Sequence, residues 1–395
     1  MKDGPAPHSY RPVVGRLQLL STYKKDWPLL NWSHEFKVLI AASARSGISG
    51  GFLHQIHPDG QQCTLELGEL PSCRTARPPA MTRHLKFNAP EIENIVVDRS
   101  QSLIIASHVF SVQNGRGVVL YFRDLWTFGK HPRACGSWLE DNDIQFISEN
   151  RLLVVRRVRG LPVLSIYNIS DIGAVAIERD YELPEAWNRS IFGFSPNTSP
   201  LTDQSSSEAM FYPDPSKRIL ILAVKTPSLA GAPSVRNWLI INESYFRPTS
   251  RKDRLRVSWH EWSQACLIRD VHSSVRGPCV NGNRVVYVEN APRSSSRSGG
   301  GTALSRLNVI EFAPYPESES HQSRAWSLVG PRSVLVPNEA TREIPSKSVD
   351  GRPIEDLRVT EDNIVLFLCL QENPDASKPV NILTFGAPPQ TRSRH

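Results

Sequence analysis

The sequence lacks the long apolar runs and the leader segment that mark membrane and secreted proteins. No stretch reaches the ~18 consecutive apolar residues of a transmembrane helix, so we expect no membrane-spanning segment and no membrane partner. Residues 1–11 are polar, contain proline and have no apolar core of a secretory signal. These absences predict a protein of the cytoplasm, the nucleus or both.

The cysteines lack the paired spacing of metal sites and redox motifs. There are six cysteines, scattered with no C-x-x-C pair. Three disulfides would suit a secreted chain, but without a signal segment we favour free thiols. Cys63, Cys279 and Cys369 lie in or beside strand-like runs, where we expect small core residues.

The sequence also lacks the common catalytic motifs. It has no P-loop, no G-x-G-x-x-G and no G-x-S-x-G. Trp259–Trp262 (WHEW) is not H-E-x-x-H, and in a strand His260 and Glu261 would point to opposite faces. We interpret this segment as structural, with a tryptophan burying apolar area.

Two histidines have a spacing that suggests metal ligands. His54 and His57 are followed by Cys63, but no fourth ligand is evident. We therefore interpret both as ordinary surface histidines. The sequence predicts no catalytic, cofactor-binding or metal-binding residue, and no cofactor.

The net charge of +7 is modest for 395 residues, and much of it lies in two clusters. The clusters are Arg151, Arg156, Arg157 and Arg159, and then Arg247, Arg251, Lys252, Arg254 and Arg256. A basic face could meet an acidic partner or nucleic acid, but neither cluster carries a nucleic-acid motif, so we favour solvated loops. The candidates for partner binding are Arg156, Arg157, Arg251, Lys252 and Arg254.

The sequence does contain a unit that recurs five times, about 50 to 80 residues apart. Each copy has a polar turn, an aliphatic run, a loop and a second strand that alternates or ends near an aromatic residue. The copies are Asp98–Ala106 with Val118–Phe122, Ser148–Val155 with Val163–Tyr167, Asp214–Val224 with Trp238–Tyr245, Asn281–Val288 with Leu304–Phe312, and Thr360–Leu368 with Val380–Phe385.

This repeat predicts an all-β fold, a single β-propeller. One unit cannot bury both faces of its strands, whereas copies stacked around an axis can. The aliphatic runs lack polar alternation, which is typical of strands covered on both faces. We expect these runs to be the inner strands of the blades and the next strands to lie nearer the rim.

The N-terminal part adds one short helix and further strands. Arg16–Trp27 places Leu17, Leu20 and Trp27 near one helical face, and Pro28 ends the helix. Strand-like runs follow at Phe36–Ala41, Gly51–Ile56 and Cys63–Leu67.

The N-terminal strands should pair with the last repeat near 380–385 and so close the ring, which removes exposed sheet edges. Counting the strands of 36–67 with the five repeats gives six blades. The alternative is seven, with the extra blade in 320–350 around Ser333–Val336. We expect a disordered N-terminus at 1–15, a helical lead-in at 16–32, the β-propeller at 33–386 and a loose tail at 387–395.

Three passages resemble the F-box proteins of basidiomycete (mushroom-type) fungi. Arg16–Trp32 (RLQLLSTYKKDWPLLNW) is similar to the helix and W..L.W segment that follow the F-box in that family. The polar turn with its aliphatic run is similar too, as in Asp98–Ile105 and Asp214–Val224, and Val257–Trp262 (VSWHEW) resembles the family's W.EW segment. The resemblance covers about residues 16–385. The fifteen residues before Arg16 hold no F-box helix, so no adaptor-binding residue is implied.

The repeat and the resemblance together predict a non-catalytic protein-interaction module. It resembles the substrate-recruiting part of an F-box ubiquitin-ligase receptor, with a protein target as partner; a Skp adaptor and cullin would join only if an F-box lies upstream. One alternative is a propeller enzyme or carbohydrate binder, with carboxylates or histidines converging at the central channel. The other is a nucleic-acid binder, whose affinity should fall steeply with salt.

Overall fold

The structure is a computed structural model of the whole chain. It describes residues 2–3, 13–27, 30–41, 43–71, 81–92, 94–98, 103–112, 115–125, 136–139, 144–148, 150–168, 170, 176–195, 197–199, 211–212, 217–227, 234–246, 255–290, 305–314, 335–344, 354–369 and 377–385.

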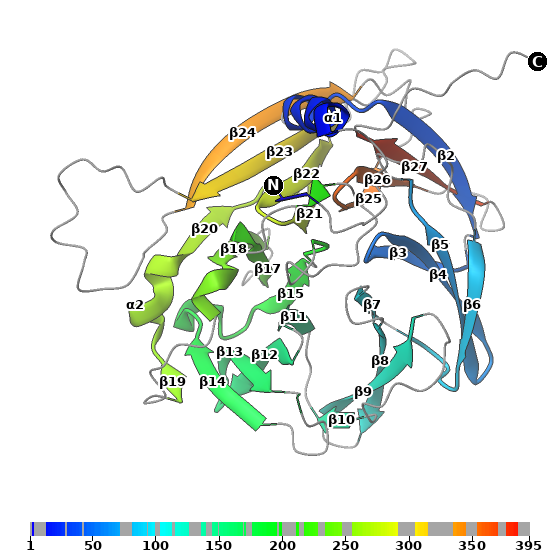
Figure 1. The fold of residues 1–395 in the computed structure, drawn as a ribbon. Helices are drawn as coiled ribbons and strands as arrows, with labels where there is room; N and C mark the ends of the chain where they lie inside the picture. The colour runs from blue at the N-terminus through cyan, green and yellow to red at the C-terminus, as the bar shows by residue number, and fades with distance from the viewer. Residues whose placement is uncertain are drawn as a thin grey trace, which may run out of the picture.

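Within these described residues, the strands form six sheets of four or five strands and one two-stranded pair. The six sheets follow one another around a ring, and one edge strand of each sheet lies nearest the centre (Figure 1). This arrangement is a β-propeller, as the repeat predicts.

The first three sheets in chain order are built as follows. The first contains β3 (Arg45–Ser49), β4 (Phe52–Asp59), β5 (Gln62–Glu69) and β6 (Met81–Phe87). The second contains β7 (Asn94–Asp98), β8 (Leu103–Val112), β9 (Gly115–Asp124) and β10 (Gly136–Leu139). The third contains β11 (Ile144–Ser148), β12 (Arg151–Val158), β13 (Leu161–Asn168), β14 (Ala176–Glu182) and β19 (Arg256–Val257), which is parallel to β14.

The next three sheets complete the ring. The fourth contains β15 (Ile191–Ser195), β17 (Ile219–Thr226), β18 (Val235–Asn242) and β20 (Cys266–Asp270). The fifth contains β21 (Val275–Asn281), β22 (Arg284–Asn290), β23 (Ser305–Pro314) and β24 (Leu335–Ile344). The sixth contains β25 (Ile354–Val359), β26 (Asn363–Leu368), β27 (Lys378–Thr384) and, from the other end of the chain, β2 (His34–Ile40).

Each predicted repeat forms the second and third strands of one sheet, so the five repeats are five blades. The aliphatic runs are β8, β12, β17, β22 and β26, and their partners are β9, β13, β18, β23 and β27. These runs are inner strands relative to their partners, as expected, but they are not the innermost ones, because a strand of five to seven residues lies inside each of them. A strand covered by neighbouring sheets on both faces must be apolar throughout, and the second strand meets that condition.

The ring closes between distant parts of the chain, as predicted. β2 pairs antiparallel with β27 from His34↔Thr384 to Ile40↔Lys378. The residues 36–67, counted as one blade from the sequence, are divided: β2 belongs to the sheet of the last repeat, and β3 to β5 form a separate sheet with β6. The seventh blade proposed for 320–350 is wrong, because β24 in that region pairs with β23 as the outer strand of its sheet.

The apolar core consists of layers between neighbouring sheets. One buried cluster lies between the first and second sheets, and others lie between the third and fourth, the fourth and fifth, the fifth and sixth, and the sixth and first. The first, fourth, fifth and sixth sheets therefore bury apolar side chains on both faces, which explains why the repeats need one another.

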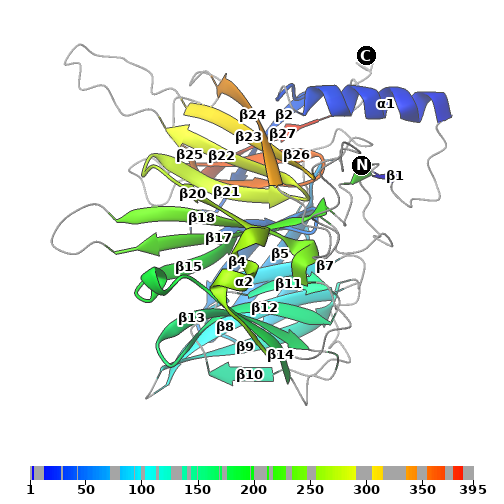
Figure 2. The same ribbon diagram turned by 90° about the vertical axis from the view of Figure 1, so that its left-hand side faces the viewer.

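The helix α1 (Val13–Asp26) agrees with the predicted helix within three residues at its start and one at its end. It lies across one face of the ring, over the fifth and sixth sheets (Figures 1 and 2). Tyr23 and Trp27 are fully buried, and the Trp27 ring stacks on Phe385 at 4.1 Å between centroids. No helix in the described part of the chain is long and apolar enough to cross a membrane.

Several short elements complete the description. Lys2–Asp3 forms β1, which pairs with β16 (Phe211–Tyr212), so two residues of the segment predicted as disordered are in a strand. The predicted tail at 387–395 lies outside the described residues. The remaining helical turns are η2 (Glu185–Trp187), η4 (Glu243–Phe246), α2 (Trp259–Trp262) and η5 (Ser263–Ala265).

Candidate functional site

Arg156, predicted to bind a partner, makes its polar contacts within its own sheet. Arg156 belongs to β12, and its guanidinium donates to both carboxylate oxygens of Asp180 on β14, at 2.8 and 3.0 Å. A third bond, of 2.6 Å, runs to Ser165 Oγ on β13, between the two. The side chains of Arg156 and Asp180 are each only 16% exposed. This charge is therefore neutralised across three strands of the third sheet.

Arg157 joins the third sheet to the segment that leads into the fourth. It donates to the backbone oxygens of Asn188 and Ser190, the latter at 2.7 Å, and its guanidinium lies 5.9 Å from the Phe192 ring. Arg157 keeps an exposed surface. The other three candidates (Arg251, Lys252 and Arg254) lie outside the described residues, so the role predicted for them stays a prediction.

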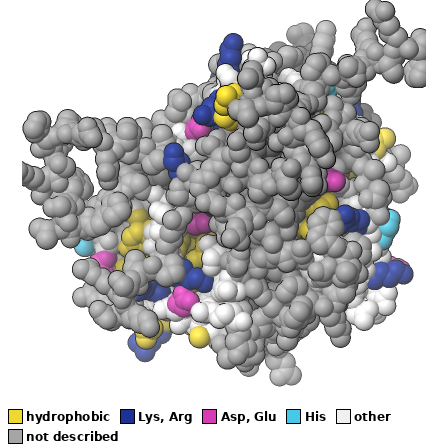
Figure 3. Space-filling view, in the orientation of Figure 1, with side chains coloured by type: hydrophobic (Ala, Val, Ile, Leu, Met, Phe, Trp, Pro, Cys, Tyr) yellow, Lys and Arg dark blue, Asp and Glu magenta, His cyan; other side chains and the backbone are white. Residues whose placement is uncertain are grey.

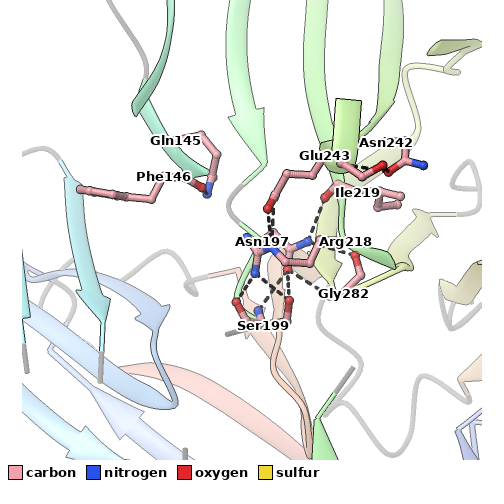
Figure 4. Close-up of polar contacts among 10 residues, drawn as sticks. Gln145, Phe146, Asn197, Ser199, Arg218, Ile219, Asn242, Glu243 and Gly282 are labelled. Atoms are coloured by element: carbon pink, nitrogen blue, oxygen red, sulfur yellow. Dashed lines mark hydrogen bonds and ion pairs between the residues drawn. The ribbon is translucent and has the colours of Figure 1, made fainter. Parts of the chain in front are cut away.

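A buried polar seam connects neighbouring sheets on the α1 side of the ring; it consists of Asn197, Ser199, Arg218, Glu243 and Gly282 (Figure 4). Asn197 Nδ2 donates to the backbone oxygens of Ile219 (2.8 Å) and Gly282 (3.0 Å), and Asn197 Oδ1 accepts from the Gly282 backbone N–H at 3.0 Å. One amide side chain thus joins the fourth and fifth sheets through three bonds.

The centre of the polar seam is an ion pair. Arg218 Nε lies 2.9 and 3.0 Å from the two carboxylate oxygens of Glu243, and Arg218 Nη1 donates to Ser199 Oγ at 2.8 Å. The Arg218 side chain is 1% exposed and that of Glu243 is 10% exposed. A charge buried this deeply needs a bound partner, since desolvation would otherwise be very costly.

The seam continues to the closing sheet. Thr198 Oγ1 donates to the Val359 backbone oxygen at 2.6 Å, and Asn281 Nδ2 donates to Thr198 Oγ1 at 3.1 Å. At the next junction, Asn363 donates to the Pro71 backbone oxygen at 2.7 Å and accepts from Thr384 Oγ1 at 2.8 Å. Two of the polar turns found in the repeats, at the start of Asn281–Val288 and of Thr360–Leu368, therefore form buried hydrogen bonds between sheets.

The sequence did not predict these hydrogen bonds between sheets, because the two residues that form each bond lie far apart along the chain. The available signal was Arg218 itself, a cation placed directly before the aliphatic run of β17. Such a residue next to a fully buried strand requires a buried acceptor.

The histidine prediction is wrong for His54. His54 is 8% exposed, and the absence of a side chain at Gly47 makes room for its ring, because a Cβ there would lie 2.8 Å from two ring atoms. Burial, and secondly the charge of Arg358, lower the pKa of His54 to about 3. His57 is partly buried, with Nε2 3.2 Å from Glu66 Oε2.

This burial predicts an acid-sensitive fold. The folded state holds His54 neutral while the unfolded chain protonates near pH 6.5, so stability is full above that pH and falls as the pH drops toward about 3. Between pH 7 and pH 5 we expect a loss of about 2 kcal/mol from this group. Urea unfolding at pH 7 and at pH 5 measures this loss in the free energy of unfolding. His54→Gln should flatten the difference, and an unchanged difference would show that other groups cause it.

The WHEW segment is structural, but it is not a strand. It forms the short helix α2, with reciprocal contacts between Ser258 and Glu261 at its start. Trp262 is fully buried and its Nε1 donates to the Glu182 backbone oxygen at 2.6 Å, while the Trp259 ring packs edge-on against it at 5.2 Å. This helix covers the boundary of the third and fourth sheets.

The described side chains offer no metal site. They contain no group of three or more His, Cys, Asp or Glu placed to hold a metal ion. The four cysteines that the structure describes are free, and burial raises the pKa of Cys279 to about 11. Such a thiol is protonated at neutral pH and is a weak nucleophile.

Comparisons with known proteins give likeness in fold only. No family model matches the chain, and no curated protein matches it. Among solved structures, the WD40 domain of Toxoplasma gondii coronin is 9% identical with a TM-score of 0.38, covering 91% of this chain and 86% of that one. A prolyl endopeptidase structure is 12% identical with a TM-score of 0.44, covering 95% of this chain and 44% of that one. Drosophila Plexin A, solved with Semaphorin 1b, is 7% identical with a TM-score of 0.33, covering 88% and 86%.

Proposed function

We propose that this protein is a non-catalytic scaffold that holds a protein target on the loops of its propeller. The observation that carries the proposal is the closed ring, sealed by the pairing of β2 with β27 and fastened by buried polar bonds between sheets. A stiff frame of this kind fixes the positions of loops at both faces, where sequence can vary without disturbing the core. No cofactor enters this proposal.

The F-box resemblance makes the proposal more specific about the kind of scaffold. We propose that the target-holding part of an F-box substrate receptor is retained, acting in the cytoplasm or nucleus. Contact with a Skp adaptor and a cullin requires an F-box segment in addition to the described residues. The resemblance of Arg16–Trp32 and Val257–Trp262 to that family supports this form.

A role in nucleic-acid binding has less support. Arg156 of the first predicted cluster is ion-paired, and Arg157 donates to two backbone oxygens and lies over an aromatic ring. On the α1 face, the described side chains of both charge signs are scattered among apolar ones (Figure 3). A single-sign surface, the usual footprint of a nucleic-acid binder, is not seen among these side chains.

Affinity purification of the whole chain, with cross-linking mass spectrometry, tests the proposal. We expect a stoichiometric protein partner whose cross-links fall on loops of one propeller face. Recovery of Skp and cullin with it would show that the chain is attached to a ubiquitin ligase, and recovery of the target alone would support a target-holding part that acts without that attachment. Absence of any stoichiometric partner, or turnover of a peptide or glycan substrate, would overturn the scaffold itself.

A further inference from the structure

Two arginines from neighbouring sheets lie side by side on the face of the ring opposite α1. Arg236 in β18 donates from Nη1 to the backbone oxygens of Val275 (3.1 Å) and Ser273 (3.5 Å). Arg276 in β21 donates from its own Nη1 to the same two oxygens, at 3.4 and 3.1 Å. Shared backbone acceptors therefore bring two positive charges together.

No described carboxylate neutralises this pair. Asp270, on the adjacent strand β20, accepts from Asn237 Nδ2 at 2.6 Å, and Glu289 on β22 makes no ion pair with either arginine. Burial, and secondly the charge of Arg276, lower the pKa of Arg236. Like charges held this close repel one another, and an anion placed between them would remove that cost.

The pair extends into a longer row. Across the fourth sheet, Ile191 of β15 lies opposite Lys225 of β17, and Lys225 lies opposite Arg236 of β18. Opposed residues share one face of a sheet, at strand spacings of about 4.8 Å. Lys225 and Arg276 are exposed, and Ile191 is 65% exposed at the inner strand. We call Lys225, Arg236 and Arg276 the cationic row; it lies at the ends of β17 and β18 remote from α1 (Figure 2).

We propose that the cationic row binds an acidic, carboxylate-rich segment of a partner protein, with an aliphatic side chain of that segment on Ile191. The charges are spread along a row from β17 to β21, which suits several separate carboxylates better than one compact phosphate. Among the side chains whose exposure the structure describes, the one exposed aromatic ring that could stack on a base is Tyr245, and it lies at the α1 end of its sheet, away from the row. A peptide therefore fits better than a nucleic acid.

This inference rests on the proposed scaffold role and names the chemistry of its partner. The test uses the whole chain and fluorescence anisotropy with a labelled hexaglutamate peptide carrying one leucine. The comparison probes are its glutamine counterpart, a single-phosphoserine peptide of otherwise neutral sequence, and a single-stranded oligonucleotide. Binding of the acidic peptide alone, weakening as salt rises from about 50 to about 300 mM, is the expected result.

Three variants locate the contact. Lys225→Glu should weaken acidic-peptide binding roughly fivefold, and the double variant Arg236→Gln/Arg276→Gln roughly 25-fold, because each exposed ion pair contributes about that factor. Lys86→Glu, an equal charge change on the exposed surface of β6, should have no effect. Circular dichroism checks that each variant is folded; Lys225→Glu keeps the test informative if the arginine variant unfolds.

The outcomes separate this inference from the scaffold role. Equal loss with Lys86→Glu, or tighter binding of the phosphopeptide or the oligonucleotide, would overturn the acidic-peptide assignment. No binding of any probe by a protein that still captures a stoichiometric partner would also overturn it, while leaving the scaffold in place. Loss of that captured partner in Lys225→Glu would support it with the natural target.

Discussion

Trp27→Ala should destabilise the protein by about 3 to 5 kcal/mol, the range for deleting a large buried aromatic side chain. Trp27 is fully buried, stacks on Phe385, and donates from Nε1 to the Glu361 backbone oxygen at 3.1 Å. The Arg284 guanidinium lies 5.1 Å from its ring centroid. The substitution therefore removes a ring that joins α1 to the fifth and sixth sheets, beside the closing pair β2–β27.

Chemical denaturation followed by circular dichroism measures the effect, with two comparison variants. Trp27→Phe keeps a ring against Phe385 but loses the bond to Glu361, so its cost should be about 1 kcal/mol from that bond plus the smaller buried area. Leu17→Ala, within α1 and with Leu17 59% exposed, should change stability by less than about 0.5 kcal/mol. A cost for Trp27→Ala as small as that of Leu17→Ala would show that α1 does not secure the ring.

The elements that sequence reasoning found are those whose burial is periodic and local. The run Ile219–Val224 is apolar at every position because sheets cover both of its faces. The closing strand β2 was placed correctly because a propeller must pair its chain ends to remove an open edge. Both inferences need only the local pattern and one rule of sheet architecture.

The elements that were missed depend on tertiary partners. The innermost strands are short and mix polar with apolar residues, as in β11 (IQFIS), so they resemble loops. The helix α2 was not predicted, although Ser258 and Glu261 have the S-x-x-E spacing of a helix start. The cationic row cannot be predicted from the sequence, because strand register pairs Lys225 with Arg236, and shared backbone acceptors between two sheets bring Arg276 beside them.

The polar seam gives the second large expected effect. Glu243→Gln should cost about 3 to 5 kcal/mol, because it leaves the buried charge of Arg218 without a carboxylate. An exposed pair of similar geometry is the control: Arg256 Nε lies 2.7 Å from Glu182 Oε1, and these side chains are 40% and 35% exposed. Glu182→Gln should cost less than about 1 kcal/mol, since water replaces the lost partner.

The double variant Arg218→Met/Glu243→Met separates the value of the ion pair from the cost of breaking it. Apolar side chains of similar length fill the same space and leave no buried charge, so the double variant should be more stable than Glu243→Gln. Urea unfolding of the single and double variants gives the coupling between the two positions. If the double variant were the least stable, the bonds from Arg218 to Ser199 and Glu243 would themselves stabilise the joint between sheets. Comparing the unfolding free energies of the double variant and Glu243→Gln therefore shows whether the ion pair of the polar seam adds stability or fixes how neighbouring blades meet.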